Sequence, residues 1–387
     1  MVLQHEFSIL DFRSTAKTYI RMSPKRSGLS AVQFTEFEWK DYCPEVFRRL
    51  RELGKVDVAN YMLSICCNET LTELTSSGKT DCLIYLSNDD RFVVKTVSKS
   101  EMKVLLEILP CYCHHVRKHE RTLLTRFYGL HVLKPSGGRK IRFVAMGNIF
   151  QSGLSIHKRF DLKGSPQGRC VSKSRVEEST IFKDPDLDLV FHLDPLTRHQ
   201  FLTQIKHDCK FLEQLGFMDY SLLLGVHVLS TKHHQALTKG SVENRILANK
   251  ISLPRNFLQK QLERDRASSV INENLPTRMP ARAVRITRSE SEGSTSSSQG
   301  KARTDEGSIA SSSLSRRKSR IDEGHEVLLF VGIIDFLQGY NMVKRVEHVY
   351  KSLQFDPQSI SAVNPHFYST RFQEFIAKVF TVRDVNA

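Results

Sequence analysis

The spacing of apolar residues predicts three helices that begin with a proline. Proline suits the first helical position, because the N–H group that it lacks would have no partner inside the helix there. Pro44 begins the first helix, and Pro195 and Pro365 begin the others after the capping residues Asp194 and Asn364. The apolar face of the last helix comprises Phe367, Phe372, Phe375, Ile376 and Val379.

Two further helices are predicted nearer the N-terminus by the same period. They cover residues 58–66 and 98–109, and Pro110 is expected to end the second because it removes a backbone donor. The run Cys111-Tyr-Cys-His-His115 is then predicted to be a loop, since no second ligand pair stands at zinc-finger spacing.

Short apolar runs between turn residues predict strands. The turn Asn88-Asp-Asp90 joins two of them, and Pro135-Ser-Gly-Gly138 joins two others into a hairpin. The predicted strands cover residues 82–86, 91–97, 127–132, 141–146, 218–226 and 326–335.

The composition changes abruptly between residues 230 and 325. This stretch is rich in Ser, Arg, Asn, Glu and Thr, and it can bury too little apolar surface to offset the entropy of ordering. We therefore predict a disordered insertion. The predicted organisation is a basic, partly disordered arm (1–33), an N-lobe with a phosphate-covering hairpin (34–145), a first part of the C-lobe (146–229), the insertion (230–325) and a second part of the C-lobe (326–387).

The net charge narrows the class of partner. The chain has 57 Lys and Arg against 42 Asp and Glu, a net charge of +15, which favours nucleic acid, an acidic membrane leaflet or a phosphorylated substrate. No helix-turn-helix, zinc-finger or aromatic single-strand motif is present, so nucleic acid is not the expected partner. No apolar stretch approaches the roughly 18 residues of a membrane span. We expect a cytoplasmic protein that is at most peripheral on a membrane.

Three residues could supply the chemistry of phosphoryl transfer from ATP. That reaction needs a cation on the phosphates, carboxylates that hold Mg²⁺ and a carboxylate that orients the acceptor hydroxyl. Lys95 ends an apolar strand, and Asp219 and Asp335 each occur in an apolar run, where a buried charge needs a partner. Glu101, in the helix that follows Lys95, can be that partner. A strand-end lysine that reaches water explains Lys95 alone equally well, and a strand-end or turn residue is the better explanation of either aspartate alone. Their order along the chain nevertheless favours a kinase.

Gly78 lies in the stretch SSGKT, which ends like a Walker A loop. That motif requires a glycine at the position of Glu73, so the stretch is not such a loop. A glycine turn before a strand that ends in lysine is typical of the hairpin that covers ATP in protein kinases. The H-R-D, D-F-G and A-P-E markers of ordinary protein kinases are nevertheless absent.

Three longer blocks resemble the signature sequences of phosphatidylinositol phosphate kinases. They are RFDLKGS at 159–165, MDYSLLLGVH at 218–227 and GIIDFLQGYNMVKRVEHVYKSL at 332–353. The likeness is to short plant phosphatidylinositol 4-phosphate 5-kinases in particular, and it runs from about Trp39 to Phe380 outside the insertion. It implies an α+β, two-lobed, protein-kinase-related fold with an antiparallel sheet in each lobe. It also implies transfer of the ATP γ-phosphate to the 5-hydroxyl of phosphatidylinositol 4-phosphate at the plasma membrane.

The resemblance assigns roles to the residues around ATP and Mg²⁺. It implies that Lys95 holds the ATP phosphates, that Asp219 is the catalytic aspartate and that Asp335 binds Mg²⁺, with Glu101 as the helix partner of Lys95. It further implies nucleotide-site roles for Gly78, Met146, Asp161 and Lys163.

A segment between Gln338 and Lys351 corresponds by resemblance to the loop that selects the lipid. Lys344, Arg345 and Lys351 would meet the phosphates of an anionic leaflet, and apolar residues between them would enter its interface. Glu347 is the residue type found in kinases that act on the 4-phosphate lipid. A 4-kinase that acts on phosphatidylinositol 5-phosphate is therefore the less favoured alternative, and a homodimer is left open.

One departure from the family pattern favours a different class of function. Asp81 stands where a second glycine is expected in the phosphate-covering loop, and its charge disfavours close approach of ATP phosphates. A catalytically weak, phosphoinositide-binding scaffold is accordingly the second hypothesis.

Overall fold

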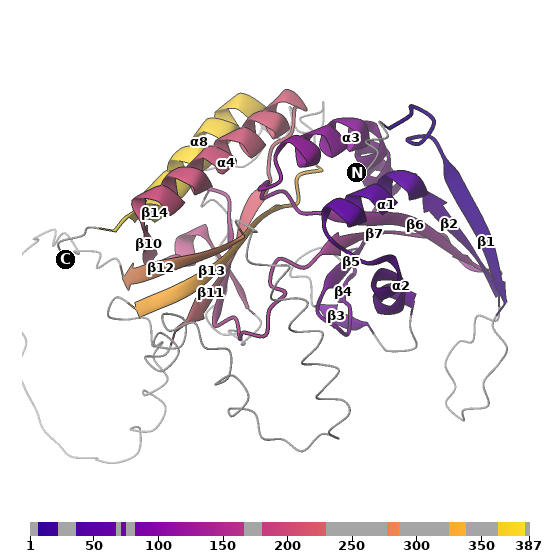
Figure 1. Cartoon of the computed structure of the whole chain (residues 1–387), viewed down its shortest axis with the longest axis horizontal. Coiled ribbons are helices and arrows are strands. Elements are labelled where there is room, and N and C mark those ends of the chain that lie inside the picture. Colours follow the sequence, from indigo (N-terminus) through magenta and orange to yellow (C-terminus); the bar gives the residue numbers. More distant parts are fainter. Residues whose placement is uncertain are drawn as a thin grey trace, which may run out of the picture.

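A computed structural model describes residues 7–21, 36–66, 71–74, 82–165, 180–229, 277–285, 325–337 and 363–383. The chain is an α+β protein built on two seven-stranded sheets, which Figure 1 shows side by side with the N-terminal sheet in indigo and purple. None of the helices within these ranges is both long and apolar enough to cross a bilayer.

The N-terminal sheet is antiparallel throughout, in the order β1-β2-β6-β7-β5-β4-β3. Its strands are β1 (Thr15–Arg21), β2 (Glu36–Tyr42), β3 (Thr72–Leu74), β4 (Ile84–Leu86), β5 (Phe92–Thr96), β6 (Phe127–Pro135) and β7 (Ile141–Gly147). The predicted hairpin of β6 and β7 and the predicted pair of β4 and β5 are confirmed. β1 lies within the predicted arm and pairs with β2, so this part of the arm is an edge strand of the sheet.

Three helices accompany this sheet: α1 (Pro44–Leu53), α2 (Val58–Cys66) and α3 (Lys99–Lys118). Pro44 and the 58–66 helix stand where the sequence predicts them. The prediction that Pro110 ends the third helix is wrong, because α3 continues through it for two more turns. Tyr112, Cys113 and Val116 are buried there, and their packing offsets the roughly 3 kcal/mol that an internal proline costs.

The run Cys111–His115 is consequently helical and not the predicted loop. Cys113 and His115 face the core, whereas Cys111 and His114 are exposed, so the four side chains point in different directions.

The C-terminal sheet is mixed, in the order β14-β10-β12-β13-β11-β8-β9. Its strands are β8 (Lys158–Leu162), β9 (Ile181–Lys183), β10 (Leu189–Leu193), β11 (Ser221–Val228), β12 (Arg278–Arg285), β13 (His325–Ile334) and β14 (Phe380–Val382). The expectation of an antiparallel sheet holds for its four central pairings, but β9 and β14 at the two edges pair in parallel.

β12 corrects the prediction of one continuous disordered insertion. This strand comes from within residues 230–325 and lies between β10 and β13 in the middle of the sheet. Met279, Ala281 and Ala283 are buried in the core. The alternation that marks a half-buried strand is therefore present, with Pro280 and Arg282 between the buried residues.

Two long helices, α4 (Pro195–Gln214) and α8 (Pro365–Val379), pack against each other over this sheet (Figure 1). Both begin as predicted: Asp194 accepts hydrogen bonds from two backbone N–H groups, and Asn364 accepts one. Phe367 is an exception to the predicted apolar face, because it is exposed while Tyr368 is buried.

Candidate active site

Strand register brings the predicted carboxylates to one edge of the C-terminal sheet. Ser221 at the start of β11 pairs with Ile334 at the end of β13. Asp219 precedes one of these strands and Asp335 follows the other, so the two side chains emerge at the same edge. Lys163 emerges there too, because Leu162 at the end of β8 pairs with Leu222.

Both aspartates adopt a left-handed backbone conformation, with φ of 66° at Asp219 and 57° at Asp335. Few residues other than glycine occupy this region, although Asp and Asn tolerate it best. Such conformations persist only where the surrounding structure holds them in place.

A buried aromatic residue directly after each aspartate provides this support. The ring of Tyr220 packs against Tyr368 and Phe372 of α8, and its carbonyl accepts a hydrogen bond from the Tyr368 hydroxyl. Phe336 packs instead against Phe127 of β6 and Tyr112 of α3. One aspartate is thus anchored in the C-terminal part and the other against the N-terminal part.

Lys95 of β5 reaches across to Asp335, with its Nζ 2.6 Å from Oδ1. The two residues are 240 positions apart in the chain. Backbone contacts between the N-terminal part and β13 support the pair, because Thr125 N–H donates to the carbonyl of Ile333 and Ile333 N–H donates to that of Leu123.

The environment of Lys95 favours its charged form. Burial is the largest influence and opposes the charge, but the charge and hydrogen bond of Asp335, with smaller contributions from Cys82 and Glu101, raise the pKa of Lys95 above its usual value. The lysine therefore carries a full positive charge at neutral pH.

A second lysine pairs with the other aspartate. The Nζ of Lys163 lies 2.6 Å from Oδ1 of Asp219, and both side chains are largely buried, at 13% and 14% exposure. Asp184 holds the backbone here, because its Oδ1 accepts hydrogen bonds from the N–H groups of Lys163 and Gly164. Gly164 has a φ of 68°, and a Cβ there would lie 2.9 Å from Phe375, so only glycine fits.

A third lysine–aspartate ion pair lies on β8 and β9, and we call the three pairs together the ion-pair cluster. Lys183, at the end of β9, lies with its Nζ 2.6 Å from Oδ2 of Asp161 on β8. Asp161 therefore forms an ion pair that was not predicted, and its nucleotide-site role stays a prediction. Lys183 and Asp184 follow Ile181 and Phe182 directly, and only the Asp184-Pro185 turn signal marks them in the sequence.

Glu101 has a different local contact from the predicted one. It sits in the first turn of α3, where its carboxylate accepts the N–H of Ser98 and the Ser98 hydroxyl accepts the N–H of Glu101. This reciprocal capping box explains the residue without any catalytic role. Its charge still acts on Lys95, whose ammonium group bonds to Asp335.

Met146 lies near the end of β7, paired with Phe127 on one side and Val93 on the other, and is half-buried. Its contact with adenine stays a prediction. Gly78, Asp81 and the loop residues Lys344, Arg345, Glu347 and Lys351 lie outside the described residues, so their predicted roles stay predictions as well.

Comparison with known proteins identifies the family. The family model described as phosphatidylinositol-4-phosphate 5-kinase matches residues 65–379. In Arabidopsis thaliana, phosphatidylinositol 4-phosphate 5-kinase 9 is 45% identical over 96% of this chain and 47% of its own length, and phosphatidylinositol 4-phosphate 5-kinase 1 is 43% identical over 96% and 49%. Phosphatidylinositol 4-phosphate 5-kinase 3 is 42% identical over 98% of this chain and 50% of its own length. The chain spans about half the length of these curated relatives. It belongs to the phosphatidylinositol-4-phosphate 5-kinase family.

Proposed function

We propose that the chain is an ATP-dependent lipid kinase that phosphorylates the 5-hydroxyl of phosphatidylinositol 4-phosphate. The observation that carries this proposal is the arrangement of Lys95, Asp335 and Asp219, which come from three distant parts of the chain to one place. Membership of the family and the names of its Arabidopsis relatives favour the substrate. A protein-kinase-related, two-lobed architecture accords with the two sheets and with a site formed where they meet.

The charged residues divide the chemical work. Lys95 and Lys163 offer ammonium groups to the donor phosphates. When no phosphate is bound, an aspartate neutralises the charge of each lysine. Asp219 is placed to orient the acceptor hydroxyl and to take its proton. Asp184 acts on the reaction indirectly, because it fixes the backbone that carries Lys163.

The same carboxylates fit Mg²⁺. Magnesium prefers oxygen ligands and is commonly held by one or two carboxylates together with substrate phosphates. The described residues contain no group of three or more His, Cys, Asp or Glu side chains that could bind a metal by themselves. Asp335, with its side chain 49% exposed, would hold the ion, and Asp219 lies at the same sheet edge. When bound, the ion supplies charge neutralisation for the phosphate in transfer.

A basic groove on the N-terminal sheet supports contact with an anionic leaflet. The groove has a volume of about 290 Å³. Cross-strand register aligns Lys17 with Lys40, Lys40 with Val132 and Val132 with Arg142. Lys17 forms an ion pair with Glu38 at 3.4 Å, and further cations such as Lys40 and Arg142 line the groove. Each cation near an anionic surface contributes about 1 kcal/mol. This favours peripheral binding at the plasma membrane, where we place the reaction.

Transfer of labelled phosphate from Mg·ATP to phosphatidylinositol 4-phosphate in vesicles tests the function. Vesicles with phosphatidylinositol 5-phosphate serve as the second substrate, and Asp219→Asn serves as the inactive control. We expect labelling of the 4-phosphate lipid that is lost in the variant.

Two other outcomes would each replace the proposal. Preferential labelling of the 5-phosphate lipid would reverse the regiochemistry. Vesicle binding without labelling of either lipid would establish the scaffold, and Asp81→Gly would then be the first reversion to test.

A further inference from the structure

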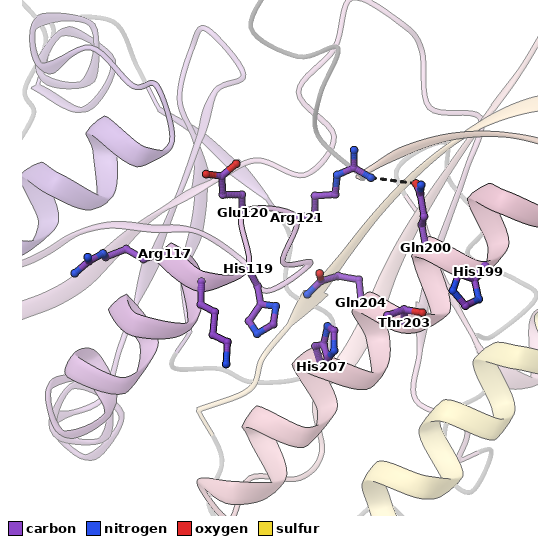
Figure 2. A pocket seen from close by; sticks show the side chains of 10 residues that line it. Arg117, His119, Glu120, Arg121, His199, Gln200, Thr203, Gln204 and His207 are labelled. Atoms are coloured by element: carbon purple, nitrogen blue, oxygen red, sulfur yellow. Dashed lines mark hydrogen bonds between the residues drawn. The ribbon is translucent and has the colours of Figure 1, made fainter. Parts of the chain in front are cut away.

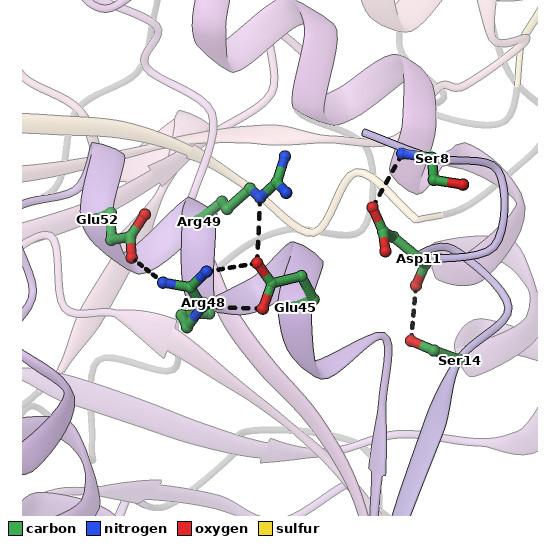
Figure 3. Close-up of polar contacts among 7 residues, drawn as sticks. All are labelled: Ser8, Asp11, Ser14, Glu45, Arg48, Arg49 and Glu52. Atoms are coloured by element: carbon green, nitrogen blue, oxygen red, sulfur yellow. Dashed lines mark hydrogen bonds and ion pairs between the residues drawn. The ribbon is translucent and has the colours of Figure 1, made fainter. Parts of the chain in front are cut away.

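A second polar cavity lies between the end of α3 and the first half of α4 (Figure 2). It has a volume of about 540 Å³ and shares no residue with the ion-pair cluster described above. Residues 117–121 form one wall, and the other wall consists of His199, Gln200, Thr203, Gln204 and His207 on one face of α4. All of these side chains are polar or charged.

The charge of the cavity is positive and unbalanced. Arg117, Lys118 and Arg121 line it, and none of the three forms an ion pair with any residue that the structure describes. The guanidinium of Arg121 donates to the side-chain oxygen of Gln200 at 3.0 Å, which holds it at the cavity. The one lining carboxylate, Glu120, points away from the neighbouring His119 in Figure 2.

Histidines from both helices meet inside the cavity. The ring centroids of His119 and His207 are 4.7 Å apart, and His119 is equally close to His115. Burial, together with the neighbouring His115 and His207, lowers the pKa of His119, although Asp208 opposes this effect. Neutral imidazoles offer N–H donors, and a nearby anion would favour their protonated form.

A buried network fixes the two walls relative to each other. Asp208 of α4 is fully buried and accepts hydrogen bonds from Thr122, Gln204 and the N–H of Leu123, with His115 Nε2 2.7 Å away. The cavity is therefore built on a rigid base, although its cations are exposed.

Two simpler explanations leave part of the cavity unexplained. Basic residues in the last turn of a helix are stabilised by its dipole, which accounts for Arg117 and Lys118 but not for Arg121 or the residues from α4. A metal site is not formed, because no suitable cluster of ligands exists among the described residues.

We propose that this cavity binds a phosphate monoester, either a soluble one or one on a lipid headgroup, through Lys118, Arg121 and the N–H donors of His119 and His207. Arginine and lysine are the usual partners of phosphate oxygens, and Thr203 and Gln200 add further donors. The proposal does not depend on the kinase activity proposed above.

The residues that follow Arg121 connect the cavity to the ion-pair cluster. Arg121 is followed directly by Thr122, Leu123 and Thr125, which connect to Asp208 on one side and to Ile333 on the other. Ile333 precedes Asp335 by two residues, so a ligand at the cavity would contact the same segment that supports Asp335.

Histidine NMR on the full chain tests the binding. The protein is labelled with ¹³C at histidine Cε1, and the His119 and His207 signals are assigned with His119→Gln and His207→Gln. Inorganic phosphate is added against sodium chloride at matched ionic strength. We expect saturable shifts of both signals with half-saturation below about 1 mM. The groups that face His119, and so act on its protonation, are His115, Lys118, His207 and Asp208.

Charge-neutralising variants test whether binding depends on the cations of the cavity or only on the net charge of the chain. Lys118→Gln with Arg121→Gln should weaken binding by about tenfold or more for each cation. Lys206→Gln with Lys210→Gln removes the same charge from exposed positions of α4 outside the cavity and should leave binding unchanged.

Vesicles distinguish the two sources of phosphate. Phosphatidylcholine vesicles with phosphatidic acid are compared with pure phosphatidylcholine in the same assay. Shifts with these vesicles and not with inorganic phosphate would assign a lipid headgroup, and the reverse would assign a soluble ester. Absence of saturable shifts in both arms, or equal shifts in the Lys118/Arg121 variant, would overturn the proposal.

Discussion

Asp219 and Asp335 have the same backbone conformation and the same kind of partner, but they differ in how they are held. The Lys163–Asp219 pair is largely buried and lies within the C-terminal sheet, whereas the Lys95–Asp335 pair joins the two sheets and leaves Asp335 half exposed. Tyr220 anchors the first aspartate to α8, and Phe336 anchors the second to α3 and β6. The two carboxylates therefore share a sheet edge but take their positions from different parts of the molecule. Any movement of one part against the other changes the Lys95–Asp335 contact first.

The largest expected difference between variants of the two aspartates is in the free energy of unfolding, whereas their losses of activity should be similar. Asp219→Asn and Asp335→Asn should each lower phosphate transfer by about 10²- to 10⁴-fold. Asp219→Asn should also cost about 3 kcal/mol of unfolding free energy, because it leaves Lys163 buried beside a neutral partner. Asp335→Asn should cost about 1 kcal/mol or less, since its carboxylate is half exposed. Urea unfolding of both variants measures the difference, and equal losses would show that the two pairs are equivalent.

An intermediate effect is expected from the tyrosines that support the two anchors. The Tyr368 hydroxyl donates to the carbonyl of Tyr220, and the Tyr112 hydroxyl donates to the carbonyl of Thr125 and accepts from the N–H of Phe127. Tyr368→Phe and Tyr112→Phe should therefore each cost about 1–3 kcal/mol, because each leaves a buried backbone group without its hydrogen-bond partner.

Kinetics of the same two variants test whether these tyrosines position the aspartates. Each substitution should lower kcat and leave KM for ATP within about twofold, because both hydroxyls are buried and hydrogen-bond to the backbone. A selective rise in KM would place the tyrosine at the nucleotide instead. Thermal unfolding of the variants provides the matching stability measurement.

The smallest effect concerns the pH dependence of the exposed pair. The pKa of Lys95 is raised in the folded state, so the pair stabilises the protein fully below the unfolded-state value of 10.5 and loses this contribution as the pH rises through the folded value. The stability difference between the wild type and Lys95→Met should be constant from neutral pH to about pH 9 and should shrink above 10.5. A difference that instead shrinks between pH 6 and 8 would mean that another group controls the pair.

The apolar context of the sequence was enough to single out the three central residues as candidates. Lys95, Asp219 and Asp335 stand out because charges interrupt runs that otherwise belong in a core. Their pairing could not be predicted, since Lys95 has Glu101 close by in sequence and the contact with Asp335 depends on how the two sheets meet. Lys183 and Asp184 were missed because the Asp184-Pro185 turn is the only local signal around them.

Local rules failed where tertiary packing outweighed them. Pro110 and Pro280 both lie inside regular elements, a helix and a central strand, although proline removes a backbone donor at each place. Pro280 is exposed while its neighbours Met279 and Ala281 are buried, so the strand keeps its inner face. The preference of a single residue does not predict how much apolar surface its neighbours bury in the fold.

β12 limits where residues can be deleted or inserted between β11 and β13. The long polar stretch between β11 and β13 is divided into two connections, because its middle returns to the sheet between β10 and β13. Deleting residues 230–325 as one block would therefore remove a central strand and separate β10 from β13, whereas deletions confined to 230–276 or 286–324 would keep β12 itself, which pairs with both. A fluorescent tag or an affinity handle should likewise be kept out of residues 278–285.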